Sequence, residues 1–181
     1  EVSCTQLRGL VDYCLVGHAE RRQLFCETDR QIRATVAAAI RNQIKPILCI
    51  GETAAEKAFG ETHDVLRDQL LGGLSEVSRE DLDKVIIAYD PVWAISTTKE
   101  SHLASPEEVA DTMKFLRRTL IDTYGKEHAE DIPILFGGSI SPSNAGAYLT
   151  IPGVNGLVMS GASLVADQFI DIVEIAKKVQ S

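Results

Sequence analysis

The amino-acid sequence predicts an α/β fold built around a parallel β-sheet. Short apolar segments alternate five times with longer segments in which apolar residues recur at helical spacing. The apolar segments are continuous rather than alternating, which is typical of parallel strands covered on both faces. The chain has 181 residues, so we expect a single domain over residues 1–181. A doubly wound sheet and part of a (β/α)8 barrel both satisfy this pattern.

Five short segments of mostly Ile, Val, Leu or aromatic residues, each followed by Gly, Asp or Ser, are predicted to be strands. They are Tyr13–Val16, Pro46–Ile50, Val85–Tyr89, Pro133–Phe136 and Leu157–Met159. In parallel α/β proteins the carboxyl ends of the strands carry the chemistry. The residues that directly follow these segments are therefore the candidates for a functional site.

Apolar faces at helical spacing predict three helices between or after the strands. These faces consist of Ile32, Val36, Ala39 and Ile40; of Val109, Met113, Leu116 and Leu120; and of Ile170, Val173 and Ala176.

Local signals predict where further helices begin and end. Ser105, Pro106 and Glu108 form a helix start with a capping box, and Gly125 is the expected end of that helix. Ser141-Pro142 repeats the start signal after the fourth strand, and residues 62–74 form a further predicted helix.

Composition and charge exclude several classes of partner. The formal net charge is −8 and the pI is near 5.0, which argues against binding to nucleic acid or to an anionic membrane surface. No apolar run approaches the roughly 18 residues of a membrane span. The chain begins with Glu1 rather than Met, so we expect a processed or trimmed start and leave open whether it is the natural one.

The four cysteines are spread along the chain and form no Cys-x-x-Cys pair, so we expect no metal site. Cys14 and Cys49 lie within predicted strands and are interpreted as small core residues. This usage suits a reducing compartment, and the expected localisation is cytoplasmic. The histidines His63, His102 and His128 have no ligand-like neighbours and are predicted to be surface residues.

Five polar or glycine-rich motifs follow the five predicted strands. In chain order they are Gly17-His18-Ala19-Glu20-Arg21-Arg22, Cys49-Ile50-Gly51-Glu52, Ala88-Tyr89-Asp90-Pro91-Val92-Trp93-Ala94-Ile95, Gly137-Gly138-Ser139 and Ser160-Gly161-Ala162-Ser163. Taken singly, each has an ordinary structural interpretation. His18 could be a hydrogen-bonded loop histidine, and Asp90 before Pro91 could simply open a turn.

Taken together, in this order and spacing, the motifs resemble those of triosephosphate isomerases. The family motifs are Gly-His-Ser-Glu-Arg-Arg, Cys-Ile-Gly-Glu, Tyr-Glu-Pro-Val-Trp-Ala-Ile-Gly-Thr-Gly-Lys, Gly-Gly-Ser and Gly-Gly-Ala-Ser. The resemblance covers essentially the whole chain. It implies a TIM-barrel type of fold, incomplete here, with five parallel βα units that match strands four to eight of the eight-stranded barrel. The family's first-strand loop, which carries an asparagine and a substrate-contacting lysine, has no counterpart in this chain.

The resemblance also implies an activity and a set of site residues. The family interconverts dihydroxyacetone phosphate and glyceraldehyde 3-phosphate, a step of glycolysis and gluconeogenesis, and uses no cofactor or metal. By motif match His18 is the electrophile, Asp90 occupies the position of the catalytic base, and Glu20 supports the site from behind. The phosphate of a small phosphorylated triose is expected near four residues, namely Ser96, Ser139, Ser160 and Gly161.

Several departures from the family pattern predict weak or impaired activity. Asp90 stands where the family has glutamate, and a carboxylate withdrawn by roughly 1 Å can lower a rate about 10²-fold. The lid sequence Ser96-Thr97-Thr98-Lys99 lacks both family glycines, which restricts its backbone. Phe136 replaces a tyrosine of the lid latch, Ala19 replaces a serine, and Ser160 replaces a glycine. The alternative is a non-catalytic relative that binds a small phosphate ester or serves only as a scaffold.

The incomplete barrel predicts self-association. Five strands cannot close an eight-stranded barrel at the usual tilt, so the sheet should end in two apolar edges at Tyr13–Val16 and Leu157–Met159. We therefore expect a homo-oligomer, most simply a two-fold dimer. The alternative is an open sheet whose own helices fold over the gap.

Overall fold

The structure, a computed structural model, describes residues 2–94 and 103–179. These residues form a five-stranded parallel sheet in the order β1-β2-β3-β4-β5. Its strands are β1 (Tyr13–Val16), β2 (Lys45–Ile50), β3 (Ile86–Tyr89), β4 (Ile134–Phe136) and β5 (Gly156–Leu157). The strands follow one another in sequence order without a reversal, whereas a doubly wound sheet reverses at its switch point. The topology is therefore that of a barrel wall, as expected.

The strand register brings the polar motifs together at one edge of the sheet. Val16 is paired with Leu48, and Ile50 is paired with Tyr89, which in turn is paired with Phe136. Because the strands are parallel, the residues that follow them lie side by side at the carboxyl edge.

The strand boundaries agree with the predicted ones to within one residue, except in β5. Residues 157–159 were the expected strand, but pairing with β4 covers Gly156 and Leu157 only. The Val158 N–H still donates to the Phe136 carbonyl at 2.9 Å, but Met159 lies outside the strand. The reason is that β4 ends at Phe136, and the chain turns away at Gly137 and leaves Met159 without a partner strand.

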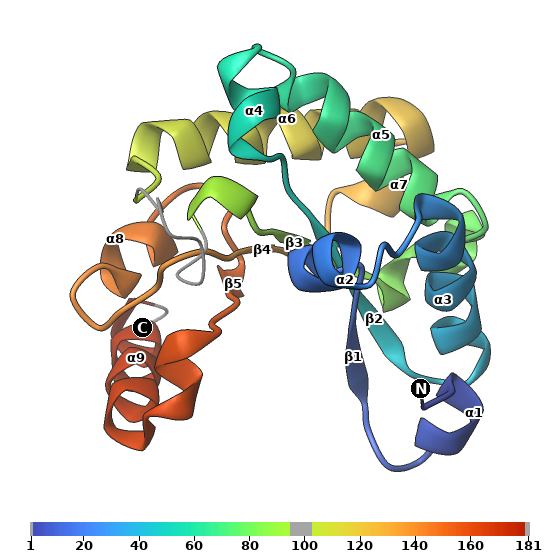
Figure 1. The fold of residues 1–181 in the computed structure, drawn as a ribbon, viewed down its shortest axis with the longest axis horizontal. Helices are drawn as coiled ribbons and strands as arrows, with labels where there is room; N and C mark the ends of the chain where they lie inside the picture. The colour runs from blue at the N-terminus through green and yellow to red at the C-terminus, as the bar shows by residue number, and fades with distance from the viewer. Residues whose placement is uncertain (1, 95–102, 180–181) are drawn as a thin grey trace.

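Helices lie along one face of the sheet and follow it in an arc (Figure 1). The α-helices are α1 (Cys4–Leu7), α2 (Ala19–Leu24), α3 (Asp29–Arg41), α4 (Ala54–Ala58), α5 (Thr62–Leu74), α6 (Pro106–Tyr124), α7 (Lys126–Ala129), α8 (Ala145–Leu149) and α9 (Ala166–Val179). Short 3-10 helices are η1 (Arg79–Lys84), η2 (Val92–Ala94) and η3 (Gly161–Leu164). No helix of the described residues is both long and apolar enough to cross a membrane.

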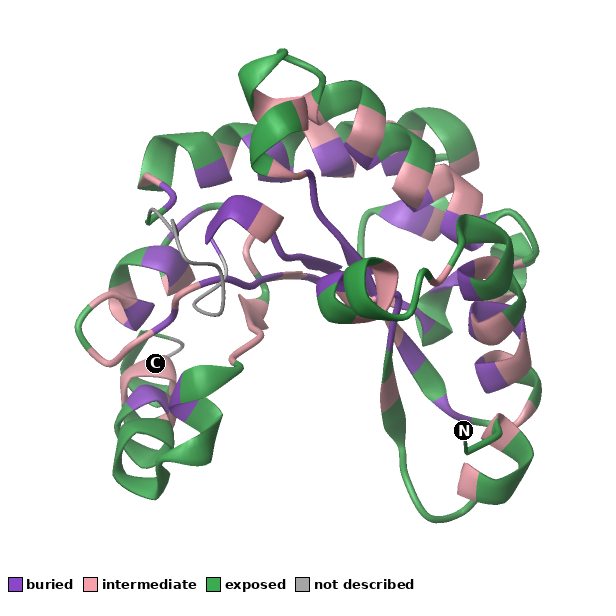
Figure 2. Ribbon diagram, viewed as in Figure 1, coloured by how far each residue is buried: buried purple, intermediate pink, exposed green. Residues whose placement is uncertain are grey.

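The core lies between the sheet and the helices that cover it. Most strand residues that point to the helices are buried, and so are most residues of the apolar faces of α3, α5 and α6 (Figure 2). Examples from the strands are Leu48, Ile87 and Ile134. The opposite face of β1 is open, because Tyr13 is 50% exposed and Leu15 is 51% exposed. Side chains alternate along a strand, so one face of β1 belongs to the core and the other does not.

The predicted helix signals of α3, α5 and α6 are confirmed. Ile32, Val36 and Ala39 of α3 are buried, while Ile40 is only partly buried. Helix α5 has the predicted bounds. Ser105 caps α6 through a complete capping box with Glu108, and the chain leaves the helix at Gly125, where φ is +87°.

Two helix predictions are wrong in detail. Ile170 of α9 is 56% exposed, and Ile172 is the buried residue instead. Helix α9 packs on α8 through its Ile172 and Ile175 side, whereas no described element covers Ile170. Helix α8 begins at Ala145 rather than after Ser141, because the Ser141 N–H donates to the side chain of Asn144 and closes a turn first.

Candidate active site

His18 and Asp90, from the first and third of the five motifs, meet at the carboxyl edge of the sheet. His18 follows Gly17 at the end of β1, and Asp90 directly follows β3. His18 Nε2 lies 3.2 Å from Asp90 Oδ2, and both side chains are mostly buried. A carboxylate and an imidazole are therefore held within hydrogen-bond distance of each other.

The hydrogen bonds of His18 define its protonation. Nδ1 accepts the backbone N–H of Glu20 at 3.4 Å, so the ring hydrogen of the neutral form lies on Nε2 and is donated to Asp90. The hydrogen bond to Asp90 raises the pKa of His18; burial opposes this, and the charges of Asp90 and Glu20 add to it. Asp90 therefore accepts the Nε2 hydrogen that an electrophilic histidine would donate to a substrate carbonyl.

Two glycines make room for Asp90. A Cβ atom at Gly51 would lie 2.1 Å from the Asp90 carbonyl oxygen, and one at Gly137 would lie 2.6 Å from Asp90 Oδ1. The Asp90 N–H donates to the Ile50 carbonyl at 2.8 Å, which fixes the backbone at this point. Asp90 is thus enclosed by the strand ends on either side of it.

Replacing Gly51 with Ala is expected to destabilise the chain by about 1–3 kcal/mol, because a methyl group cannot share this space with the Asp90 backbone. Chemical denaturation followed by circular dichroism measures the change. Gly72→Ala is the matched control: nothing lies within 4 Å of its added methyl, and alanine favours helix α5. A Gly51→Ala variant as stable as the parent would show that the strand ends are loosely packed here.

Glu20 lies beside His18, but its side chain is exposed. Its backbone N–H contacts the imidazole, and its charge raises the pKa of His18. The role assigned to Glu20 from the motif remains a prediction.

The four candidate phosphate-binding residues are not equally placed. Both the N–H and the hydroxyl of Ser139 donate to the Ala94 carbonyl, at 2.8 and 2.9 Å. Ser160 and Gly161 are exposed at the start of η3. Ser96 lies outside the described residues. The N–H of Ser139 is thus already occupied, which the sequence did not indicate.

The structure adds a buried carboxyl group, Glu52, to which the motifs gave no role. It is only 1% exposed and follows β2. Its Oε1 accepts the indole N–H of Trp93 at 2.8 Å and the hydroxyl of Tyr89 at 3.3 Å. Its Oε2 has no hydrogen-bond partner among the described residues. Burial raises the pKa of Glu52, and the hydrogen bonds from Trp93 and Tyr89 oppose this shift.

Trp93 is the single tryptophan of the chain, so its fluorescence should report the ionisation of Glu52. We expect a fluorescence transition with a midpoint above 4.5, the ordinary pKa of a glutamate. A group with a raised folded-state pKa contributes stability below its unfolded value and loses that contribution as pH rises through the folded value. Glu52→Gln should therefore abolish the fluorescence transition. It should also remove the fall in the free energy of unfolding that the parent shows as pH rises through the same range. Exposed Glu80 provides the control: Glu80→Gln should leave the midpoint in place.

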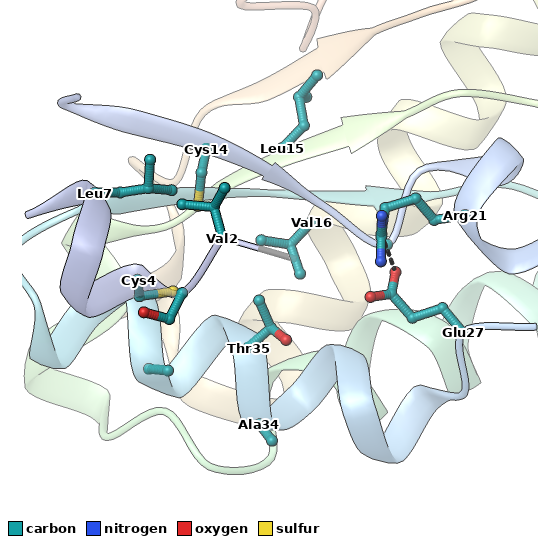
Figure 3. A pocket seen from close by; sticks show the side chains of 13 residues that line it. Val2, Cys4, Leu7, Cys14, Leu15, Val16, Arg21, Glu27, Ala34 and Thr35 are labelled. Carbon is teal, nitrogen blue, oxygen red and sulfur yellow. Dashed lines mark hydrogen bonds and ion pairs between the residues drawn. The ribbon is translucent and has the colours of Figure 1, made fainter. Parts of the chain in front are cut away.

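The space near these groups is small. A cavity of about 10 Å³ lies between Gly17, Arg22, Cys49 and Asp90, enough for about one water molecule. A groove of about 580 Å³ lies instead between α1, α3 and the edge of β1 that pairs with no strand of the described sheet (Figure 3). It contains the thiols of Cys4 and Cys14, and burial raises the pKa of Cys14.

The described cysteines, and the described histidines other than His18, have ordinary structural surroundings. Cys49 is buried as expected, and burial raises its pKa to about 12. His63 is exposed and stacks on Phe115, His128 is half-buried, and His102 lies outside the described residues. No cluster of three or more His, Cys, Asp or Glu side chains within residues 2–94 and 103–179 is placed to hold a metal ion.

Comparison with known proteins decides the family. A family model for triosephosphate isomerase matches residues 1–176. The chain belongs to the triosephosphate isomerase family. The resemblance of its motifs and the expected partial barrel are both confirmed by this match and by the sheet.

Curated triosephosphate isomerases are about 40% identical to this chain. The relative from Caldanaerobacter subterraneus subsp. tengcongensis is 41% identical over 174 residues, which are 96% of this chain and 69% of the relative. The one from Chlorobium phaeobacteroides is 43% identical over 177 residues, which are 97% and 69% of the two chains. The Chlamydia trachomatis serovar D enzyme is 42% identical over 175 residues, or 96% of this chain and 62% of the relative. The chain thus spans about two thirds of the length of these triosephosphate isomerases.

Proposed function

We propose that this chain carries the base and the electrophile of a triosephosphate isomerase reaction and catalyses it weakly. The observation that carries the proposal is the 3.2 Å contact between His18 Nε2 and Asp90 Oδ2 at the carboxyl edge of the sheet. Membership of the family supplies the reaction, the interconversion of dihydroxyacetone phosphate and glyceraldehyde 3-phosphate in glycolysis and gluconeogenesis.

The proposed steps use the two side chains in turn. The Asp90 carboxylate removes a proton from the carbon next to the substrate carbonyl. The Nε2 hydrogen of His18 polarises that carbonyl and stabilises the negative charge that develops on its oxygen. Since Asp90 accepts this hydrogen in the present structure, the substrate carbonyl must replace Asp90 as the acceptor. Glu20 supports the histidine from behind through its N–H on Nδ1.

The geometry supports a low rate. The Asp90 carboxylate lies close to Gly137 and His18. The cavity beside it has room for about one water molecule rather than a triose. A substrate site for a triose therefore requires more room than this cavity offers.

We propose that the ligand is a phosphorylated triose whose phosphate binds near Ser139, Ser160, Gly161 and Ser96. The strand-end location supports this, because barrels bind phosphate at their last loops. The Ser139 N–H, however, is donated to Ala94 and must be released first. This occupied donor is the observation that favours the second candidate function, a non-catalytic relative that serves as a binding module or scaffold.

The proposed setting is the cytoplasm, which suits four unpaired thiols. The proposed protein partner is a second copy of the chain, because β1 is a terminal strand of the described sheet and exposes Tyr13 and Leu15.

A coupled assay for glyceraldehyde 3-phosphate isomerisation tests the function. The expected result is measurable turnover, more than about tenfold below that of a full-length relative, because one misplaced group alone can cost about 10²-fold. His18→Gln should remove it, whereas His63→Gln, which changes an exposed histidine stacked on Phe115, should not. Activity that survives His18→Gln would reject His18 as the electrophile, whereas a parent chain without turnover would support the non-catalytic alternative. Calorimetry with a two-carbon phosphate-bearing carboxylate then separates a binding module from a scaffold.

A further inference from the structure

Arg22 joins three parts of the fold directly beneath the candidate site. Its Nε donates to the Gly17 carbonyl at 2.8 Å, and its Nη2 donates to the Cys49 carbonyl at 3.4 Å. Its Nη1 forms an ion pair with Asp29 Oδ1 at 2.6 Å. The Arg22 side chain is mostly buried, so its two carbonyl contacts are sheltered from water, whereas the Asp29 side chain is 61% exposed. One guanidinium therefore connects the end of β1, the end of β2 and the first residue of α3.

Both carbonyls lie next to the groups that hold His18 and Asp90. The Gly17 carbonyl belongs to the peptide bond that leads into His18, and Gly17 has a φ of +73°, in the left-handed region. Cys49 precedes Ile50, whose carbonyl accepts the N–H of Asp90 at 2.8 Å. One of these peptide groups therefore leads directly into His18, and the other directly precedes the residue that holds the Asp90 backbone.

The small cavity at this point is bounded by the same residues. Its lining includes Arg22 and the residues of both carbonyls, Gly17 and Cys49, together with Asp90 and Gly51. The cavity has room for only about one water molecule, so the groups around it are closely packed. A displacement of the guanidinium would therefore also displace Asp90.

We propose that Arg22 is a positioning residue that sets the separation between His18 and Asp90. The planar guanidinium offers five N–H donors in a fixed arrangement, so it can hold two carbonyls of different strands and a carboxylate at once. A lysine at this position could keep the charge and the pair with Asp29, but it could not hold both carbonyls in the same plane. The catalytic consequence rests on the proposed isomerase function, whereas the geometric claim does not.

A proton NMR titration of His18 in the intact chain tests the geometry without any assay of activity. The His18 resonance is assigned by its absence in His18→Gln. The parent should titrate above 6.5, the ordinary value of a histidine, because Asp90 and Glu20 are the charged groups that face the ring. Arg22→Met should lower the His18 pKa as far as Asp90→Asn does, and combining the two changes should lower it no further.

Two controls separate positioning from general stability. Asp29→Asn removes the ion pair but leaves both carbonyl contacts, so the unfolding midpoint should fall while the His18 pKa stays at the parent value. Arg21→Met removes the neighbouring arginine, which is paired with Glu27, and should likewise leave the His18 pKa unchanged.

The catalytic arm compares kcat and KM in the same variants. If the parent is an isomerase, Arg22→Met should lower kcat by about 10²-fold with little change in KM, because base and electrophile lose their relative placement. If the parent chain shows no turnover, the proposed function is rejected. The titration of His18 then still tests whether Arg22 positions His18 and Asp90. If Arg22→Met does not fold, Arg22→Lys carries the test with a smaller downward shift of the His18 pKa. An unchanged His18 pKa in the folded Arg22 variants would overturn the proposal.

Discussion

Replacing Asp90 with glutamate is expected to raise isomerase turnover by about 10²-fold. In the present structure the Asp90 carboxylate rests against Gly137 and accepts the Nε2 hydrogen of His18. One more methylene moves the carboxylate by roughly 1 Å, past the imidazole and toward the position of a bound substrate, and an error of that size accounts for a factor of about 10². The longer side chain also releases the histidine hydrogen for the substrate carbonyl.

The coupled isomerisation assay measures this gain, and the titration of His18 provides an independent readout. Because the hydrogen bond with Asp90 is the main cause of the raised pKa of His18, the pKa should fall in Asp90→Glu. Asp90→Asn is the control, since it keeps the length of the side chain, loses the base and should abolish turnover. Turnover that persists in Asp90→Asn would mean that Asp90 is not the base, and a loss in Asp90→Glu would mean that the aspartate carboxylate is not withdrawn from the substrate.

The sequence predicted the elements whose causes are local. The helix over residues 62–74 and the capped start at Ser105 depend on residues within a few positions of each other, and both are confirmed. The pairing of His18 with Asp90 at the strand ends also follows from the rule that parallel strands end at one edge. Local signals and strand topology were sufficient for the helices and for the shared edge, whereas the choice of His18 and Asp90 as a catalytic pair came from the family resemblance.

Features that depend on contacts between distant segments were not predictable from the sequence. The use of the Ser139 N–H by Ala94 and the burial of Glu52 under Trp93 arise only when loops from different strands meet. The apolar face of α9 was misplaced for a related reason. A helix with apolar residues on several sides buries whichever side has a neighbour, and here α8 lies on the side of Ile172.

The chain is expected to form a dimer at micromolar concentration. β1 and β5 are the terminal strands of the described sheet, and a terminal strand offers unpaired backbone groups to a second chain. The exposed face of β1 carries Tyr13 and Leu15, and apolar residues are also exposed at the end of α2, at Leu24 and Phe25. A stable interface buries about 800 Å² on each partner, and pairing by two-fold symmetry would bring this apolar surface of both copies together.

Light scattering coupled to size exclusion measures the mass, which should be twice the chain mass of 19.7 kDa. Leu15→Lys should shift the population to the monomer, because it places a charge in the centre of the proposed contact. Phe59→Lys is the matched control, since Phe59 is 81% exposed at the end of α4, away from β1, and its replacement should leave the dimer intact. A parent chain that elutes as a soluble monomer would refute self-association. That result would favour the other arrangement, in which the chain's own helices cover the open sheet.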